Sequence, residues 1–457
     1  MKIYRNAMEM IGRTPMLELQ TLDTGKCRLF AKLELNNPAH SVKDRIALTM
    51  IEQAEKRGDL KPGQTIVEGT AGNTGIALAL VARQKGYPLI LVIPDKMSPE
   101  KISSCRAMGA KVVLTRSDVQ RGHPDYYQDL AQKIADDTGG YFINQFGNND
   151  NALSHEQTTA PEIYEQMNGE VDAIVVGCGS SGTVTGLGRW LSKNAPHVEL
   201  IVADPEGSIV SGYINEGVIG KAGSWMVEGI GEDFIPDVAD MSFARKAYAV
   251  PDREAFLLAR ELLEKEGIMA GPSTGTLLGG ALAYCREQTE AKNVVTLACD
   301  TGNRYISKLF NDFWMWEQGF ITRPEHGDLR DLISRPHEDR ATVAVTPENT
   351  VATAHKRMVD NGFSQLPVVD EERLLGGVNE ADLLRAVVDD AQGFELKVKE
   401  VMNSNFPSVP VSLAKRDLAE RMQGEPALAV VTPERDFLGM VTRSDLLGYC
   451  RRGGRID

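Results

Sequence analysis

The chain has 457 residues, of which 42% are hydrophobic and 25% charged, a composition typical of a folded globular protein. Its net charge of −14 argues against a nucleic-acid partner, because such proteins carry a basic face. The sequence shows no apolar stretch near the ~20 residues that span a bilayer, no signal-peptide core, and no metal-ligand spacing among its six cysteines. We therefore expect a cytoplasmic protein of about three packing units, without a membrane partner or a bound metal.

Short apolar runs alternate with helical patterns between Thr65 and Thr301. Runs of this kind, rich in β-branched residues and bounded by Gly or Pro, indicate strands buried on both faces. The alternation predicts an α/β fold in which helices cover both faces of a parallel sheet. The runs lie at residues 65–68, 89–93, 111–114, 171–176, 200–203 and 294–297.

A helical pattern covers Ser41 to Arg57, with an apolar stripe along one face, Ser41 as a candidate cap and Gly58 as a candidate end. Lys43 lies in its first turn. The positive end of the helix disfavours an ammonium group there, which favours a neutral and nucleophilic amine. A solvated surface lysine is the ordinary alternative.

Two loops of small residues each follow a buried run and precede a helical pattern. In the first, Glu68 to Gly75, the side chains of Asn73 and Thr74 add donors to a backbone that stays open to an anion. The second, Gly177 to Gly182, is a G-x-G-x-x-G sequence, and the unpaired N–H groups of the helix that follows bind phosphate. Parallel strands place such loops at one edge of a sheet, so two anion sites are expected there.

The second loop also fits a dinucleotide fold. Asp204 lies 22 residues after Gly182, close to the place of a ribose-binding acid, so an NAD-dependent dehydrogenase is one reading. A tight turn without a ligand is another. Further along, Ser273 in the segment Gly271 to Thr276 fits a helix N-cap as well as a ligand contact. These motifs alone do not identify the ligand that carries the phosphate.

The pattern changes after Phe320. Residues 321–340 are rich in charge and read as a linker or a solvated helix. Beyond them, residues 375–384 recur as residues 438–447, and duplicated units of this size normally stack on each other. The predicted division is a catalytic domain at 1–320, a linker at 321–340, and two repeats at 341–395 and 396–457.

Together these segments resemble the fold-type II pyridoxal-phosphate enzymes of β-replacement, and most closely the cystathionine β-synthase family, over nearly the whole chain. The resemblance implies two open, twisted α/β subdomains with mostly parallel sheets, followed by a tandem CBS-domain (Bateman) module. It also implies a haem-free lyase, since the chain begins almost at the catalytic core without the Cys/His haem segment of animal enzymes. It rests on the order and spacing of residues 11–15, 37–38, 41–45, 70–75, 228–231 and 271–276.

The resemblance assigns coenzyme roles residue by residue. Lys43 matches the lysine that binds pyridoxal 5′-phosphate covalently, Asn73 matches the residue that bonds its 3′-oxygen, and Ser273 matches the hydroxyl at its ring nitrogen. The matching phosphate loop consists of Gly179, Ser180, Ser181, Gly182 and Thr183.

Substrate residues follow from the same resemblance. A loop with Gln145 clamps the substrate α-carboxylate, and Ala71 departs from the serine usual in that loop, which removes one hydrogen bond. Gly229 and Glu232 belong to a second loop, where the Glu232-Asp233 pair can meet the amino group of homocysteine or can be a solvated acidic turn. The matching residues of the first loop are Thr70, Ala71, Gly72, Asn73 and Thr74.

The implied reaction condenses L-serine with L-homocysteine to L-cystathionine and water, with hydrogen sulfide production as related chemistry. The nearest alternative is an O-acetylserine sulfhydrylase (cysteine synthase) that uses sulfide. Sulfide has no amino group, so such an enzyme needs no acidic residue to bind one. The dehydrogenase is a remote alternative, and a third is an adenylate-sensing binding protein with an inactive body. A homodimer or higher homo-oligomer is expected.

The repeats resemble modules that bind an adenosyl ligand through a hydroxyl and a carboxylate. The second repeat keeps the motif, with Thr442 and Asp445 as the ribose contacts. The first repeat departs from it, with Gly377 and Asn379 where an apolar residue and the hydroxyl are expected. At most one good regulatory site is therefore predicted.

Overall fold

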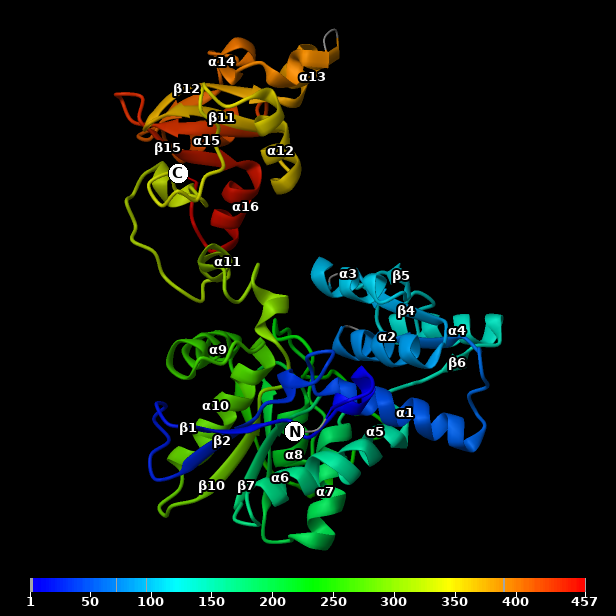
Figure 1. Cartoon of the computed structure of the whole chain (residues 1–457). Coiled ribbons are helices and arrows are strands. Elements are labelled where there is room, and N and C mark those ends of the chain that lie inside the picture. Colours follow the sequence, from blue (N-terminus) through cyan, green and yellow to red (C-terminus); the bar gives the residue numbers. More distant parts are fainter. Residues whose placement is uncertain (1–2, 71, 96, 389–390, 457) are drawn as a thin grey trace. The chain divides into compact units, whose positions relative to one another are not determined.

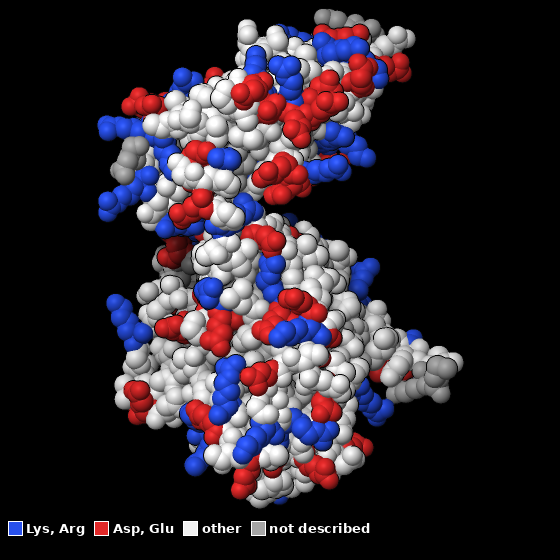
Figure 2. Space-filling model, turned by 90° about the vertical axis from the view of Figure 1, so that its left-hand side faces the viewer, with Lys and Arg blue, Asp and Glu red and all other residues white. Residues whose placement is uncertain are grey.

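The computed structural model describes residues 3–70, 72–95, 97–388 and 391–456, and divides the chain into two compact units (Figure 1). The first unit is Met1–Phe310 and the second is Asn311–Asp457. No helix of the described residues has the length and apolarity to cross a bilayer. Figure 2 shows one face of the molecule, on which acidic and basic side chains are interspersed and no large area is basic.

The larger sheet of the first unit has six strands in the order β1-β2-β10-β7-β8-β9. Strand β1 runs antiparallel to β2, and every other pair is parallel. The helices α9 and α10 pack on this sheet, and Leu262 and Leu278 share a buried core with Val175 and Ile201. The bounds are β1 Met16–Leu19, β2 Arg28–Lys32, β7 Ala173–Gly177, β8 Glu199–Pro205, β9 Ala244–Val250, β10 Asn293–Leu297, α7 Gly182–Asn194, α8 Val210–Glu216, α9 Asp252–Glu266 and α10 Pro272–Arg286.

The smaller sheet of the first unit is parallel throughout, in the order β5-β4-β3-β6. Its two faces bury separate cores, because successive side chains of a strand point to opposite faces. Ile66 of β3 packs with α1, α2 and α3, whereas Val67 packs with Ala131 and Ala135 of α4. The bounds are β3 Ile66–Gly69, β4 Leu89–Pro94, β5 Lys111–Thr115, β6 Tyr141–Phe142, α1 Lys43–Arg57, α2 Asn73–Lys85, α3 Pro99–Ala107 and α4 Tyr127–Thr138.

The predicted α/β class with two mostly parallel sheets is confirmed, while two helix starts differ in detail. Helix α1 begins at Lys43 with Val42 as the N-cap residue, and Ser41 accepts only a 3.3 Å bond from the Lys43 N–H. Helix α10 starts from Gly271 with Pro272 in its first turn, so Ser273 is not its cap. Helix α5 (Asn149–Ser154) continues through a π-helical turn, His155–Thr159, into α6 (Ala160–Gln166).

The second unit contains the sequence repeat as two similar halves. A β12–α13 step in the first half matches a β15–α16 step in the second. Residues expected to be a linker contribute Leu329, Leu332 and Ile333 to the core of the second half. The bounds are β11 Gln365–Asp370, β12 Arg373–Asn379, β13 Ser408–Pro410, β14 Ala427–Val431, β15 Phe437–Thr442, α11 Asp312–Glu317, α12 Val351–Asn361, α13 Glu380–Val388, α14 Val398–Val401, α15 Lys415–Arg421 and α16 Arg443–Arg451.

Short 3₁₀ helices complete both units. They are Ala7–Met10, Glu34–Asn36, Met241–Phe243, Gly302–Tyr305, Leu329–Leu332 and Ala391–Glu395.

Candidate active site

The predicted site residues lie where parallel strands end and helices begin. Asn73 opens α2 after β3, and Gly182 opens α7 after β7. Lys43 opens α1, and Ser273 lies in the first turn of α10. The two loops do not share the edge of one sheet as predicted, because β3 belongs to the four-stranded sheet and β7 to the six-stranded sheet. The carboxyl ends of parallel strands are where α/β folds bind ligands, so these helix starts, drawn from both sheets, form one candidate site.

Lys43 is held in an environment that disfavours its charge. Burial lowers the pKa of the Lys43 ammonium, and the nearby acidic groups of Cys299, Asp300 and Glu232 only partly oppose this. Desolvation disfavours the charged form, so the amine is more often neutral than a surface lysine would be. This environment differs from that of a solvated surface lysine and favours a nucleophilic amine.

A buried ion network anchors the start of α1 next to Lys43. Arg45 donates to both oxygens of Glu34, at 2.8 Å each, and to both oxygens of Glu162, at 2.9 and 2.7 Å. Thr14 donates to Glu34 at 2.7 Å, and Asn37 accepts from the Gly12 N–H at 2.8 Å and donates to Glu34. Three motif segments of the sequence therefore meet around one carboxylate, which fixes the helix that presents Lys43.

The phosphate loop combines close backbone approach with hydroxyl donors. Ser181 has a positive φ of 65°, and the loop ends at the N-terminus of the thirteen-residue helix α7. A side-chain carbon on Gly182 would lie 2.0 Å from Oδ1 of Asn151, so the residue must be glycine. Asn151 donates to Ser180 Oγ at 2.9 Å, and His155 Nε2 lies 3.3 Å from Thr183 Oγ1.

The loop after β3 is tied to residues from elsewhere in the first unit. Thr74 donates to Gln145 Oε1 at 2.7 Å, and the Gly72 N–H donates to Thr70 Oγ1 at 3.2 Å. The predicted substrate residues Thr70, Gly72, Thr74 and Gln145 are thus together. Ala71 lies outside the described residues.

The loop that contains Glu232 and Asp233 places the Glu232 carboxyl near Lys43 and leaves the Asp233 carboxyl in solvent. Burial, with Asp233 and Asp204 nearby, raises the pKa of Glu232 to about 8, and Lys43 opposes this rise. Asp233 is exposed. Gly229, with a φ of 92°, lets this loop pass beside the phosphate loop, where a side-chain carbon on Gly179 would lie 2.7 Å from the Gly229 carbonyl.

Asp204 is committed to protein structure rather than to a ribose. Its carboxyl is fully buried and accepts the Ser211 N–H at 2.8 Å, inside helix α8. Burial raises the pKa of Asp204 to about 6. This placement disfavours the dinucleotide reading of the loop from Gly177 to Gly182.

Several site residues carry no sequence motif and were missed. Arg304 donates to Asn73 Oδ1, Asn73 donates to Asp300 Oδ2 at 2.7 Å, and Tyr305 donates to the same oxygen at 2.8 Å. Lys101 of α3 donates to Tyr305 at 3.1 Å. Asp300 follows β10 at the predicted ligand edge, which was an available signal, whereas Lys101 had none.

Comparisons with known proteins agree with this geometry. The profile of the family described as pyridoxal-phosphate dependent enzyme matches residues 7–300, and that of the CBS domain matches residues 330–389 and 398–452. The chain belongs to the family of pyridoxal-phosphate-dependent enzymes, and its second unit carries a pair of CBS domains.

Individual relatives show which enzymes of this family the chain is similar to, and over how much of its length. Cystathionine beta-synthase of Apis mellifera is 33% identical over 99% of this chain and 92% of its own length. Cysteine synthase A of Salmonella typhi is 40% identical over 68% of this chain and 97% of its own length. The crystal structure of O-ureido-L-serine synthase has 33% identity and a TM-score of 0.64, covering 71% of this chain and 98% of that one. The predicted resemblance to the cystathionine β-synthases is confirmed.

The residues present fit pyridoxal phosphate. A phosphate needs donors, and the loop offers the hydroxyls of Ser180, Ser181 and Thr183 with the N-terminus of α7. Gly179 and Gly182 leave room for close approach, since side chains there would collide with Gly229 and Asn151. Lys43 would hold the coenzyme covalently, and Ser273, 4% exposed, would meet its ring nitrogen.

Proposed function

We propose that the protein catalyses the β-replacement that joins L-serine and L-homocysteine to give L-cystathionine and water. The supporting observation is that the loop carrying Glu232 packs against the phosphate loop, where the Gly231 N–H donates to the Cys178 carbonyl at 2.6 Å. A second substrate that carries an amino group can use such a carboxyl, whereas sulfide cannot. The full-length likeness to a cystathionine beta-synthase supports the same substrates.

Lys43 performs the proton transfers of the reaction. Bound pyridoxal phosphate supplies the electron sink that acidifies the α-carbon of serine. The neutral amine of Lys43 takes the α-proton and returns a proton to the departing β-hydroxyl. Because burial lowers the Lys43 pKa, a larger fraction of the amine is neutral and able to act as a base than for a lysine in water.

The two loops orient the substrates. The backbone of Gly72 and the side chains of Thr70, Thr74 and Gln145 hold the α-carboxylate of serine. Glu232 holds the amino group of homocysteine, and the positive charge of that group lowers the carboxyl pKa from about 8, so the bound pair is ionic. The hydroxyl of Ser273 is a neutral partner for the ring nitrogen, and this moderates the electron sink in favour of elimination and replacement.

The test of the catalytic role is Lys43→Ala. The variant should fold yet lose the visible absorption band of the covalently bound coenzyme. Its turnover should fall by more than the ~10²–10⁴-fold typical of one positioned acid or base, because nucleophile and base disappear together. Retention of both the band and the turnover would refute the assignment.

The test of the second substrate compares Glu232→Gln with Asp233→Asn. The first variant should raise the KM for homocysteine more than the KM for serine. The second removes an exposed charge that raises the Glu232 pKa, so it should not raise the KM for homocysteine. Parallel losses with homocysteine, serine and sulfide would indicate general damage to the loop. Wild-type protein that prefers sulfide over homocysteine would favour cysteine synthase, the alternative supported by 40% identity to cysteine synthase A.

We also propose that the CBS pair binds one adenosyl ligand at Thr442 and Asp445. Asp445 Oδ2 accepts from the Thr442 N–H at 2.7 Å and from its hydroxyl at 2.6 Å, which places both side chains at the start of α16. In the first half, Asn379 and Asp382 form a similar turn, but Arg385 already pairs with Asp382. Because the Asp382 carboxylate is already paired with Arg385, this contact supports a single ligand site, in the second half.

Calorimetry with S-adenosylmethionine, AMP and ATP tests this site. Binding of one equivalent that disappears in Asp445→Ala, with Asp382→Ala as the matched control, is the expected result. Silence with all three ligands would refute the sensor, and binding that survives Asp445→Ala would place the ligand elsewhere. A haem-free, cytoplasmic homodimer or larger homo-oligomer completes the proposal, and the absorption spectrum and solution mass test the haem and the assembly.

A further inference from the structure

A chain of hydrogen bonds runs from Lys101 to Arg304 through Asn73. Lys101 donates to the Tyr305 hydroxyl at 3.1 Å, and Tyr305 donates to Asp300 Oδ2 at 2.8 Å. Asn73 Nδ2 donates to the same Asp300 oxygen at 2.7 Å, while Arg304 Nη1 donates to Asn73 Oδ1. All but Asn73 are buried, with exposed fractions of 0–8%.

The two ends of this chain fix the direction of every bond in it. Lysine and arginine have only donors, so the Tyr305 oxygen must accept from Lys101 and the Asn73 oxygen must accept from Arg304. The Tyr305 hydrogen is then left for Asp300. The amide of Asn73 consequently has one orientation, with Nδ2 toward Asp300, and one of its two Nδ2 hydrogens remains unused by this chain of bonds.

Each end is itself anchored. Lys101 pairs with Glu228, and Lys308 pairs with the other oxygen of Glu228 at 2.7 Å. The second terminal nitrogen of Arg304 donates to the carbonyl of Ala39, four residues before Lys43. Arg304 therefore ties the segment that leads into α1 to the first residue of α2.

We propose that Arg304, Asp300 and Tyr305 are positioning residues that clamp the Asn73 amide with its Nδ2 hydrogen toward the coenzyme. The inference rests on the coenzyme of the proposed function and on the family resemblance that makes Asn73 the contact of its 3′-oxygen. A free asparagine amide can flip, and a flipped amide would present an acceptor to the anionic 3′-oxygen. The clamp removes that state, and Arg304 contributes to the clamp through its bond to the Asn73 amide oxygen.

A double-mutant cycle separates this role from a merely structural one. The readouts are the dissociation constant of pyridoxal phosphate on resolved and reconstituted protein, and the visible absorption band of the reconstituted enzyme. Arg304→Gln should weaken coenzyme binding about tenfold or more and shift the band, since hydrogen bonds to charged groups are individually strong. In an Asn73→Ala background the same substitution should change the dissociation constant several-fold less, because only the Arg304 bond to the Ala39 carbonyl is then lost.

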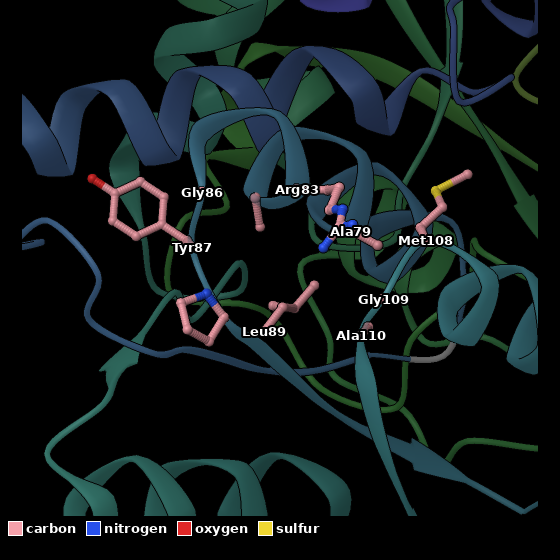
Figure 3. Close-up of a pocket in the computed structure, with 10 residues that line it drawn as sticks. Ala79, Arg83, Gly86, Tyr87, Leu89, Met108, Gly109 and Ala110 are labelled. Atoms are coloured by element: carbon pink, nitrogen blue, oxygen red, sulfur yellow. The ribbon is translucent and has the colours of Figure 1, made fainter.

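Two further variants keep the test decisive. Arg304→Lys retains the charge but cannot reach both Asn73 and Ala39 as a planar fork, so it should lie between wild type and Arg304→Gln even if the latter folds poorly. Arg83→Gln, on the same helix as Asn73 (α2), is the matched control. Arg83 lines a cavity of about 240 Å³ near the far end of α2 from Asn73 (Figure 3), and this variant should leave both readouts unchanged.

The outcomes divide cleanly. Equal losses from Arg304→Gln with and without Asn73, unchanged binding and spectrum in Arg304→Gln, or an equal effect of Arg83→Gln would each overturn the clamp. These readouts need no amino-acid substrate, so absence of turnover with homocysteine would count against the proposed reaction and leave the clamp standing.

Discussion

Replacing Arg45 with methionine should destabilise the catalytic unit more than any loss of a surface ion pair. The Arg45 side chain is 1% exposed and Glu34 is fully buried, so the substitution leaves a buried carboxylate without its cation. Breaking such a pair costs about 3–5 kcal/mol. We expect a value near 3 kcal/mol, because Lys32 remains 3.0 Å from Glu162 and Glu162 is 18% exposed.

Urea unfolding of the coenzyme-loaded protein, followed by visible circular dichroism, measures this difference. The matched control is Arg116→Met, whose partner Asp118 lies 2.8 Å away with side chains 56% and 69% exposed, and which should cost far less stability because water screens the pair. Adding Glu34→Gln to Arg45→Met should restore part of the stability, because it removes the stranded charge.

The same network gives a pH signature. Arg45 lowers the pKa of Glu34 and, with Lys32, holds that of Glu162 at about 2. A carboxyl whose folded pKa is depressed stabilises the fold above its ordinary pKa near 4.5, and this contribution fades as the pH falls toward 2. The gap between wild type and Arg45→Met should therefore narrow below pH ~4.5. A gap no larger than that of Arg116→Met at pH 7 would refute the reasoning.

Three other substitutions have defined outcomes. Gly182→Ala places a carbon 2.0 Å from Asn151 Oδ1, so coenzyme affinity, measured by equilibrium titration, should fall at least about tenfold. Unchanged affinity would contradict the role of Gly182 in the phosphate loop. Gly275→Ala places a carbon 1.8 Å from the Ala255 carbonyl, so it should force α9 from α10 and cost about 1–3 kcal/mol in urea unfolding. Burial raises the pKa of Glu68 to about 8, so the folded state keeps a proton that the unfolded state releases between pH 4.5 and 8, and stability falls with rising pH. Glu68→Gln should flatten that slope, and an unchanged slope would exclude Glu68 as its source.

Six strands were predictable because their apolar runs are continuous. The run at 89–93 became β4, Leu89–Pro94, and that at 294–297 became β10, Asn293–Leu297. Strand β9 was missed because Arg245 and Lys246 interrupt its apolar run. Strand β5, Lys111–Thr115, lies at the edge of its sheet and was found because its run is continuous, but its partly exposed residues correct the prediction of burial on both faces.

The candidate site divides in the same way. Lys43, Asn73 and the phosphate loop lie in local motifs, so sequence reasoning found them. Lys101 and Arg304 enter the site only through the packing of α3 and of the segment after β10, which no local spacing encodes. Their roles come from donor-only chemistry that acts across more than 200 residues of chain.

The π-helical turn at His155–Thr159 makes the length of this helix as important as its composition. Such a turn contains one residue more than the α-helical turn it replaces. Deleting a residue there would leave Asn151 beside Ser180 but rotate the following segment by about 100°, carrying Glu162 away from Arg45. The one additional residue thus lets Asn151 and Glu162, on one continuous helix, face their different partners, so the number of residues between them matters as well as their identity.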